Sequence, residues 1–379
     1  MDPLATETSA GRRTPRPICL ALQGGGSHGA FTWGVLDRLL EDDRIEIEGI
    51  SATSAGAMNA GAMLQGYLRG GRDGARQALD GFWRKVAAMA VFSPIRRSYY
   101  DKLVSNWNLD TSPAYLFADT LMRLFSPYEL NPQNLNPLRD FIHEALDADA
   151  IRAADPFKLY VSATSARTGQ IRVFDRLEIS ADVFLASACL PFAFHAVEID
   201  GEPYWDGGYM GNPALFPLIA NCSSDDIVIV QINPLIRDQS LRTASEIMNR
   251  LNEITMNASL RHELQFIAAM QKLIDSERLS GGATNNLRNT RIHMVAAPET
   301  MASLGVASKS NGEIEFLEYL RDVGRACAEV WLKENFDLLG ERSSVNLEEE
   351  FLRGISRRFQ EPAPEERTPS GPAEKLRSV

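Results

Sequence analysis

The sequence predicts an α/β protein in which a mostly parallel central sheet carries helices on both faces. Its first strand candidate, residues 18–22, is apolar at every position, as in a strand buried on both faces of a sheet. A glycine turn and a segment with helical spacing of apolar residues follow at 30–40, and the same strand–turn–helix order recurs at 45–68. This alternation is typical of a three-layer architecture with a parallel sheet in the middle.

The remaining elements follow in chain order. Aromatic residues and prolines are frequent from 82 to 150, which predicts helices and loops laid over the sheet as a cap-like insertion. Strand patterns return at 159–163, 171–174, 196–199, 227–232 and 292–295, and the Asp-Gly pair at 200–201 is typical of a hairpin turn. Long helical patterns cover 242–279 and 314–336.

Composition excludes several classes of protein. The 379 residues are 44% hydrophobic, which is enough for a sizeable core, and carry a net charge of −11. Such an acidic chain is a poor phosphate binder, so nucleic acid is not an expected partner. The four cysteines are scattered singly without a CxxC pair, so neither a zinc knuckle nor a thioredoxin-type site is indicated.

The ends of the chain differ from its centre. Residues 1–16 are polar and predict a flexible arm without a secretory signal, and 361–379 are rich in proline and charge and predict a disordered tail. Residues 17–235 hold the motifs described next, and 236–360 form a C-terminal extension. No apolar stretch approaches the roughly 20 residues of a spanning helix, and we expect a cytoplasmic protein, at most peripheral to a membrane.

A glycine turn joins the first strand to the first helix. It reads Gly24-Gly25-Gly26-Ser27-His28-Gly29, and its exposed backbone N–H groups at a helix start favour an anion. Because it also matches G-x-G-x-x-G, a dinucleotide-binding oxidoreductase is an alternative. That reading requires an acid at the end of the second strand; Glu46 and Glu48 lie nearby, but the strand ends at 51–52. A tight turn without a ligand is the third reading.

A serine turn follows the second strand. Ala52-Thr53-Ser54-Ala55-Gly56 resembles the nucleophile elbow G-x-S-x-G, with alanine in place of the first glycine. In such a turn the serine projects above the edge of the sheet, at the positive end of the following helix. A serine that only caps that helix is the alternative.

An acid precedes two glycines at Asp206-Gly207-Gly208. Such a segment is usually a turn with a capping aspartate, but beside an exposed serine the carboxylate can act as a base. None of the five histidines lies in a convincing triad context, although His195 is close to Asp206 in sequence. A serine–aspartate pair therefore fits the sequence better than a triad.

The three motifs, in this order, resemble the patatin-like phospholipase family, whose pattern is G-G-G-x-[Arg/Lys]-G, G-x-S-x-G and D-G-[Gly/Ala]. A stretch at 186–194, Ala-Ser-Ala-Cys-Leu-Pro-Phe-Ala-Phe, resembles the family's A-S-x-x-x-P-x-x-F. Two positions depart from the pattern. His28 replaces the usual Arg or Lys, so we expect the charge at this position to depend on pH, and Ala52 replaces the first glycine of the elbow.

The resemblance implies a patatin-like fold over 17–235, a modified α/β-hydrolase-like arrangement, and a lipid acyl hydrolase of the carboxylic ester class. It implies that Ser54 is the nucleophile, that Asp206 is the base, and that the amides of Gly24, Gly25 and Gly26 form an oxyanion hole. His28, Gly29, Ala52, Gly56, Gly207 and Gly208 would support these motifs. No cofactor or metal is required. The expected partners are a lipid or acyl-ester substrate and, transiently, a membrane surface; a catalytically weak scaffold on the same fold is the alternative.

Overall fold

The computed structural model describes residues 14–91, 93–98, 101–102, 107–153, 155–237, 241–276, 287 and 289–353. The predicted tail at 361–379 and the predicted arm up to residue 13 lie outside the described residues. The first strand begins at Arg16, the last residue of the predicted arm, and the Arg16 guanidinium donates to the carbonyl oxygens of Phe336 and Leu339.

A single mixed sheet forms the centre of the described chain. Its strands are β1 (Arg16–Leu22), β2 (Ile45–Ala52), β3 (Lys158–Ser165), β4 (Ile171–Asp175), β5 (Val197–Ile199), β6 (Glu202–Asp206), β7 (Asp226–Gln231) and β8 (Arg291–Ala296). The order across the sheet is β5-β6-β3-β2-β1-β7-β8, with β4 also paired to β3. The pairs among β3, β2, β1, β7 and β8 are parallel, and β4, β5 and β6 pair antiparallel.

Helices connect and cover these strands. They are α1 (Gly29–Leu40), α2 (Ala55–Ala90), α4 (Pro113–Leu124), α5 (Pro127–Leu130), α6 (Pro137–Ala145), α7 (Ala148–Ala153), α8 (Ala181–Ser187), α9 (Phe216–Asn221), α10 (Ala244–Asp275), α12 (Pro298–Ser303) and α13 (Ile314–Asn335). Helix α2 is interrupted at Gly70 and Gly71, where the backbone leaves helical geometry. Short 3-10 turns include η1 (Gly26–His28), η3 (Gly207–Tyr209) and η5 (Val306–Ser310).

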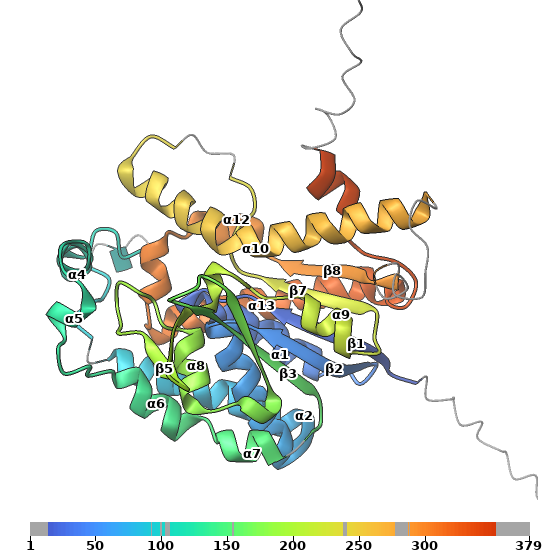
Figure 1. Cartoon of the computed structure of the whole chain (residues 1–379), viewed down its shortest axis with the longest axis horizontal. Coiled ribbons are helices and arrows are strands. Elements are labelled where there is room, and N and C mark those ends of the chain that lie inside the picture. Colours follow the sequence, from blue (N-terminus) through green and yellow to red (C-terminus); the bar gives the residue numbers. More distant parts are fainter. Residues whose placement is uncertain are drawn as a thin grey trace, which may run out of the picture.

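The three layers follow from the alternation of side chains along the central strands. Ile18, Leu20 and Leu22 of β1 pack into one core with α1, α2 and α13, whereas Cys19 and Ala21 pack into a second core with α9 and α10. Figure 1 shows α10 across one face of the sheet, with α1 and α2 on the other. The predicted α/β class with helices on both faces is confirmed.

The range 82–150, predicted as a cap-like insertion, begins within α2 and holds α4, α5, α6 and the first half of α7, and it is unevenly buried. Helix α6 contributes Phe141 and Ile142 to the core, whereas α4 has no buried residue. The helices predicted at 242–279 and 314–336 are α10 and α13; residues 277–279 lie outside the described residues. The predicted hairpin is present between β5 and β6, where Asp200 and Gly201 both have positive φ.

Candidate active site

Two neighbouring parallel strands bring the glycine turn and the serine turn together. Strand β1 pairs with β2 so that Leu22 lies opposite Ala52, the last residue of each strand. Because both strands end at the same edge of the sheet, the turns that follow them are adjacent. A Cβ atom at Gly24 would lie 2.6 Å from Cβ of Ser54. This close approach requires glycine at position 24 and places Ser54 directly against the turn.

Ser54 has the strained backbone of a nucleophile elbow. Its φ is +53°, which is uncommon for a residue other than glycine, and its side chain is almost buried at the start of α2. The Ser54 N–H donates to Oγ of Ser187 at 2.8 Å, which holds this conformation. Ala52, in place of glycine, is the last residue of β2 and has ordinary strand geometry, so its methyl group is accommodated.

Asp206 comes from β6, which is separated from β2 by a single strand of the same sheet. It ends β6, opposite Ala163 of β3, the strand next to β2. Its side chain is 3% exposed, and Oδ1 accepts a hydrogen bond from the N–H of Gly208 at 2.6 Å. Burial raises the pKa of Asp206 to about 6, while hydrogen bonds from Gly208 and the Ser54 side chain and the charge of Lys309 act in the opposite direction. The Ser54 side chain therefore lies close enough to the Asp206 carboxylate to lower its pKa.

The amides of the glycine turn are not equivalent, which corrects one expectation. The Gly24 N–H donates to Oδ1 of Asn212 at 2.6 Å, so it is already occupied and does not belong to an oxyanion hole. Within the described residues, the N–H groups of Gly25 and Gly26 have no hydrogen-bond partner. Gly26 has φ of +57°, and a Cβ there would lie 2.5 Å from the carbonyl oxygen of Lys309. Only glycine fits at this position.

His28 does not carry a pH-dependent charge, contrary to the expectation from sequence. It is 4% exposed, and Nε2 lies 2.7 Å from Oγ of Ser308. Burial, and to a smaller extent the charge of Lys309, lowers the pKa of His28 to about 3. The imidazole is therefore neutral from pH 5 upward and does not replace the arginine or lysine of the family pattern.

The other motif glycines lie where chain segments pass close to one another. A Cβ at Gly29 would lie 2.7 Å from Cβ of Ala55, and one at Gly208 would lie 2.7 Å from the sulfur of Met256. The backbone carbonyls of Leu22 and Ser162 similarly fill the space beside Gly56 and Gly207. These glycines allow the turns to pack, which is a structural role.

The side chain of His195, the histidine closest to Asp206 in sequence, is engaged by other residues. His195 places Nε2 3.1 Å from the carbonyl oxygen of Pro127, and its ring stacks on Tyr128 at 4.0 Å between centroids. The acid required for a dinucleotide site is also engaged elsewhere, because the Glu48 carboxylate accepts from the amides of Ser223 and Ser224 at 2.7 Å each. Neither a histidine triad nor a ribose-binding acid is assembled among these residues.

Sequence reasoning missed Asn212 as a residue that holds the glycine turn. Its Oδ1 accepts from Gly24, its Nδ2 donates to the carbonyl of Met256 in α10 at 3.0 Å, and it is fully buried. Nothing in its sequence context marks this role. Ser187 could have been singled out from the sequence, because it is the serine of the A-S-x-x-x-P-x-x-F stretch.

Neither a metal centre nor a membrane span is present among the described residues. Over these residues, no group of three or more His, Cys, Asp or Glu side chains is arranged to hold a metal ion. None of the helices in the described part of the chain combines the length and apolar character required to cross a bilayer.

Comparison with known proteins identifies the family. No curated protein matches this chain. Among solved structures, that of VipD from Legionella pneumophila is similar at 14% sequence identity and a TM-score of 0.38, covering 85% of this chain and 67% of that one. The family model described as patatin-like phospholipase matches residues 20–219, more than half of the chain. The chain therefore belongs to the patatin-like phospholipase family, a family of lipid hydrolases.

Proposed function

We propose that this protein is a carboxylic ester hydrolase that cleaves lipid acyl esters with a dyad of Ser54 and Asp206. The observation that supports the proposal is a buried Asp206 carboxylate whose pKa responds to the Ser54 side chain, in a site where the amides of Gly25 and Gly26 have no partner among the described residues. A nucleophilic serine requires a base within hydrogen-bond reach, and this arrangement supplies one without histidine.

In the proposed reaction, Oγ of Ser54 attacks the ester carbonyl and its proton passes to Asp206. The negative charge that develops on the carbonyl oxygen is stabilised by the amides of Gly25 and Gly26. The alcohol leaves with the proton from Asp206, and an acyl-serine remains. Water then attacks the acyl group as Asp206 takes its proton, and that proton passes to Oγ of Ser54 as the bond to the acyl group breaks and the fatty acid is released.

The environment of Asp206 suits this role. An ordinary aspartate is a weak base toward a hydroxyl group, whereas burial raises the pKa of Asp206 to about 6 while leaving it mostly ionised at pH 7. The positive end of α2 at Ser54 favours the serine oxygen as it becomes negative.

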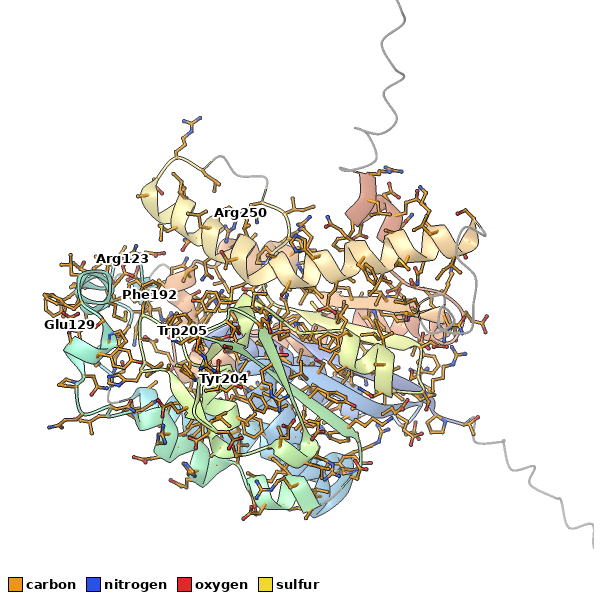
Figure 2. All side chains as sticks on the ribbon, viewed as in Figure 1. Arg123, Glu129, Phe192, Tyr204, Trp205 and Arg250 are labelled. Atoms are coloured by element: carbon orange, nitrogen blue, oxygen red, sulfur yellow. The ribbon has the colours of Figure 1, made fainter. Side chains whose placement is uncertain are left out.

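We also propose a transient contact with a lipid surface near this site. Exposed apolar side chains occur on α4 (Leu116, Phe117, Leu124), after α8 (Leu190, Phe192) and on the first half of α10 (Ile247, Leu251, Ile254). Figure 1 shows α4, α5 and the first half of α10 on the side toward which β1 and β2 point, and Figure 2 shows the side chains of Arg123 and Phe192 on the same side of this view. A lipid surface is the partner that matches exposed apolar side chains gathered on one side of a lipid hydrolase.

Three variants test the dyad. Ser54→Ala should abolish both hydrolysis of a p-nitrophenyl ester and labelling by a fluorophosphonate, and Asp206→Asn should be nearly as harmful. His195→Ala is the control and should be mild, since its ring contacts Pro127 and Tyr128. Retained turnover in Ser54→Ala would refute the serine mechanism, and a loss in His195→Ala equal to that in Ser54→Ala would require a triad.

Vesicle flotation tests the lipid surface. Phe117→Glu and Leu251→Glu should each reduce flotation with phospholipid vesicles and leave hydrolysis of a soluble ester unchanged. The matched control is Val330→Glu, at an exposed apolar residue of α13. Flotation that is the same in all four proteins would remove the proposed contact.

A further inference from the structure

The 3-10 turn η5, which lies outside the family match, packs directly against the glycine turn. The carbonyl oxygen of Lys309 fills the space beside Gly26, at 2.5 Å from the position of a Cβ there. The preceding residue, Ser308, contacts Nε2 of His28 at 2.7 Å. Two consecutive residues of η5 therefore form the wall behind the turn that carries the free amides.

The Lys309 side chain is joined to the same turn through one other side chain. Its Nζ donates to Oδ1 of Asn233 at 2.8 Å and to Oδ1 of Asn252 at 2.9 Å. Asn233 in turn donates from Nδ2 to the carbonyl oxygen of Gly24 at 2.9 Å. Loss of the Lys309 ammonium would leave Oδ1 of Asn233 without this donor and thereby weaken the support of the main chain at Gly24.

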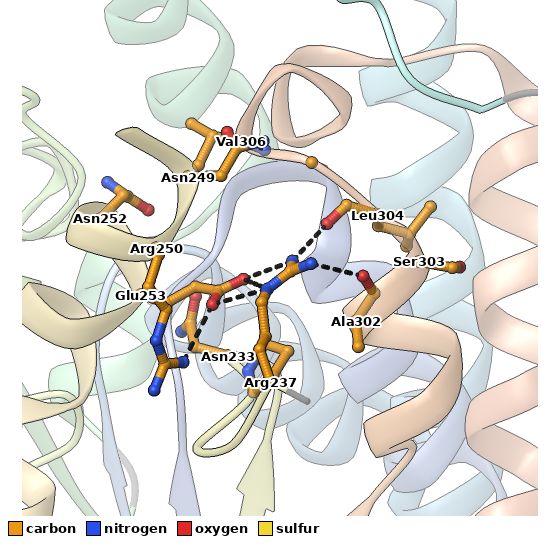
Figure 3. A network of polar contacts seen from close by, with 12 residues as sticks. Asn233, Arg237, Asn249, Arg250, Asn252, Glu253, Ala302, Ser303, Leu304 and Val306 are labelled. Carbon is orange, nitrogen blue, oxygen red and sulfur yellow. Dashed lines mark hydrogen bonds and ion pairs between the residues drawn. The ribbon is translucent and has the colours of Figure 1, made fainter. Parts of the chain in front are cut away.

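Among the described residues, Lys309 forms no direct ion pair with Glu253, the acid that raises its pKa most. Glu253 of α10 is already bonded by Arg237 at 2.6 Å and by Arg250 at 3.2 Å, as Figure 3 shows. Arg237 also donates to the carbonyls of Ala302 and Leu304, which ties the segment before η5 to α10. This network fixes η5 and leaves Lys309 with two neutral amide oxygens as acceptors.

The charge acts instead on the candidate active site. Lys309 lowers the pKa of Asp206 and thus favours its carboxylate form. His28, at the position where the family pattern has arginine or lysine, is neutral. Lys309 lies far from His28 along the chain, yet its ammonium supplies a positive charge that acts on Asp206, which the neutral His28 does not.

We propose that Lys309 is a positioning residue of the active site, which holds the glycine turn through Asn233 and supplies the positive potential that favours an anion at Gly25 and Gly26. The inference rests on the proposed function and adds to it: the segment after residue 219 is part of the active site and not only a covering layer. A merely structural lysine would stabilise the fold without changing how the site responds to pH.

The pH profile separates these two roles. The charged and titratable groups facing Lys309 are Glu253 on α10, Asp206 on β6, Arg237 after β7 and His28 on η1. Burial lowers the pKa of Lys309 to about 8, assisted by Arg237 and opposed by Glu253 and Asp206. The wild-type rate should fall above pH 8 as the ammonium loses its proton.

The experiment compares Lys309→Met, Lys309→Gln and the control Lys333→Met, at an exposed lysine of α13, in the full-length chain. Lys309→Met should lower kcat for a soluble ester and the rate of fluorophosphonate labelling by about 100-fold, as for loss of an oxyanion-hole donor, with KM changed much less. The acid limb of its pH–rate profile should move to higher pH, because the carboxylate form of Asp206 loses a stabilising charge. The alkaline limb of the profile, near pH 8, should disappear. Lys333→Met should match the wild type.

Lys309→Gln keeps a donor for the asparagines without the charge, so it should fold even where Lys309→Met does not, and it should also lose the alkaline limb. Wild-type rates with unchanged limbs in either folded variant would overturn the inference. A wild-type protein that neither hydrolyses esters nor labels at Ser54 would instead refute the proposed function itself.

Discussion

Replacing Asp206 with asparagine should remove activity and at the same time stabilise the fold. Asparagine has nearly the same shape, and its Oδ1 can still accept the hydrogen bond from the Gly208 N–H. What the substitution removes is a negative charge that is 3% exposed. Proteins often retain such destabilising groups where the reaction requires them.

The size of the effect follows from the pKa. Burial raises the pKa of Asp206 from 3.8 to about 6. Each pKa unit corresponds to about 1.4 kcal/mol, so ionising Asp206 in the folded protein costs about 3 kcal/mol at neutral pH, as an upper bound. A protein of this size gains a few degrees in Tm from a change of that order.

The sign of the pH dependence is fixed by the same values. Because the folded protein binds the Asp206 proton more tightly than the unfolded chain does, the wild type gains stability from this group as pH falls from about 6 toward 3.8. The advantage of Asp206→Asn should therefore be largest above pH 6 and shrink by pH 4. Thermal unfolding of both proteins at pH 7.5 and pH 4.5 measures the difference in stability and how it changes with pH. Ester hydrolysis at pH 7.5 measures the loss of activity. A variant that is less stable than wild type at pH 7.5, or an advantage that does not shrink, would refute the reasoning.

Three further outcomes are expected. The kcat/KM of the wild type for a soluble ester should fall about tenfold from pH 7 to pH 5, because the ionised fraction of Asp206 drops from about 90% to about 10% around a pKa of about 6; a flat profile would exclude Asp206 as the base. Gly26→Ala should reduce labelling of Ser54 by at least tenfold, because the added Cβ would meet the Lys309 carbonyl. The control is Gly81→Ala, where the Cβ would stand in open space on α2. It should leave the labelling rate unchanged and raise stability by about 1 kcal/mol. Ser187→Ala leaves the Ser54 N–H without its acceptor and should cost about 1–3 kcal/mol in urea unfolding; unchanged stability would show that this hydrogen bond does not hold the elbow.

The sequence by itself determined the class of fold and the motifs of the site. Strands buried on both faces have continuous apolar runs, so the runs at 18–22 and 227–232 predicted the strands β1 and β7. The residue types at Asp200-Gly201 predicted the hairpin turn. The motifs around Gly24, Ser54 and Asp206 are local patterns whose meaning depends on a few adjacent residues. These motifs could therefore be recognised from the sequence alone.

Only the tertiary structure decided which groups around those motifs are available and charged. Whether the Gly24 amide is free depends on Asn212, and the protonation of His28 depends on its burial beside Ser308 and Lys309. These partners lie roughly 190 and 280 positions away along the chain. Hydrogen-bond occupancy and desolvation depend on distance in space, and no local pattern of residues records which distant segments the fold brings together.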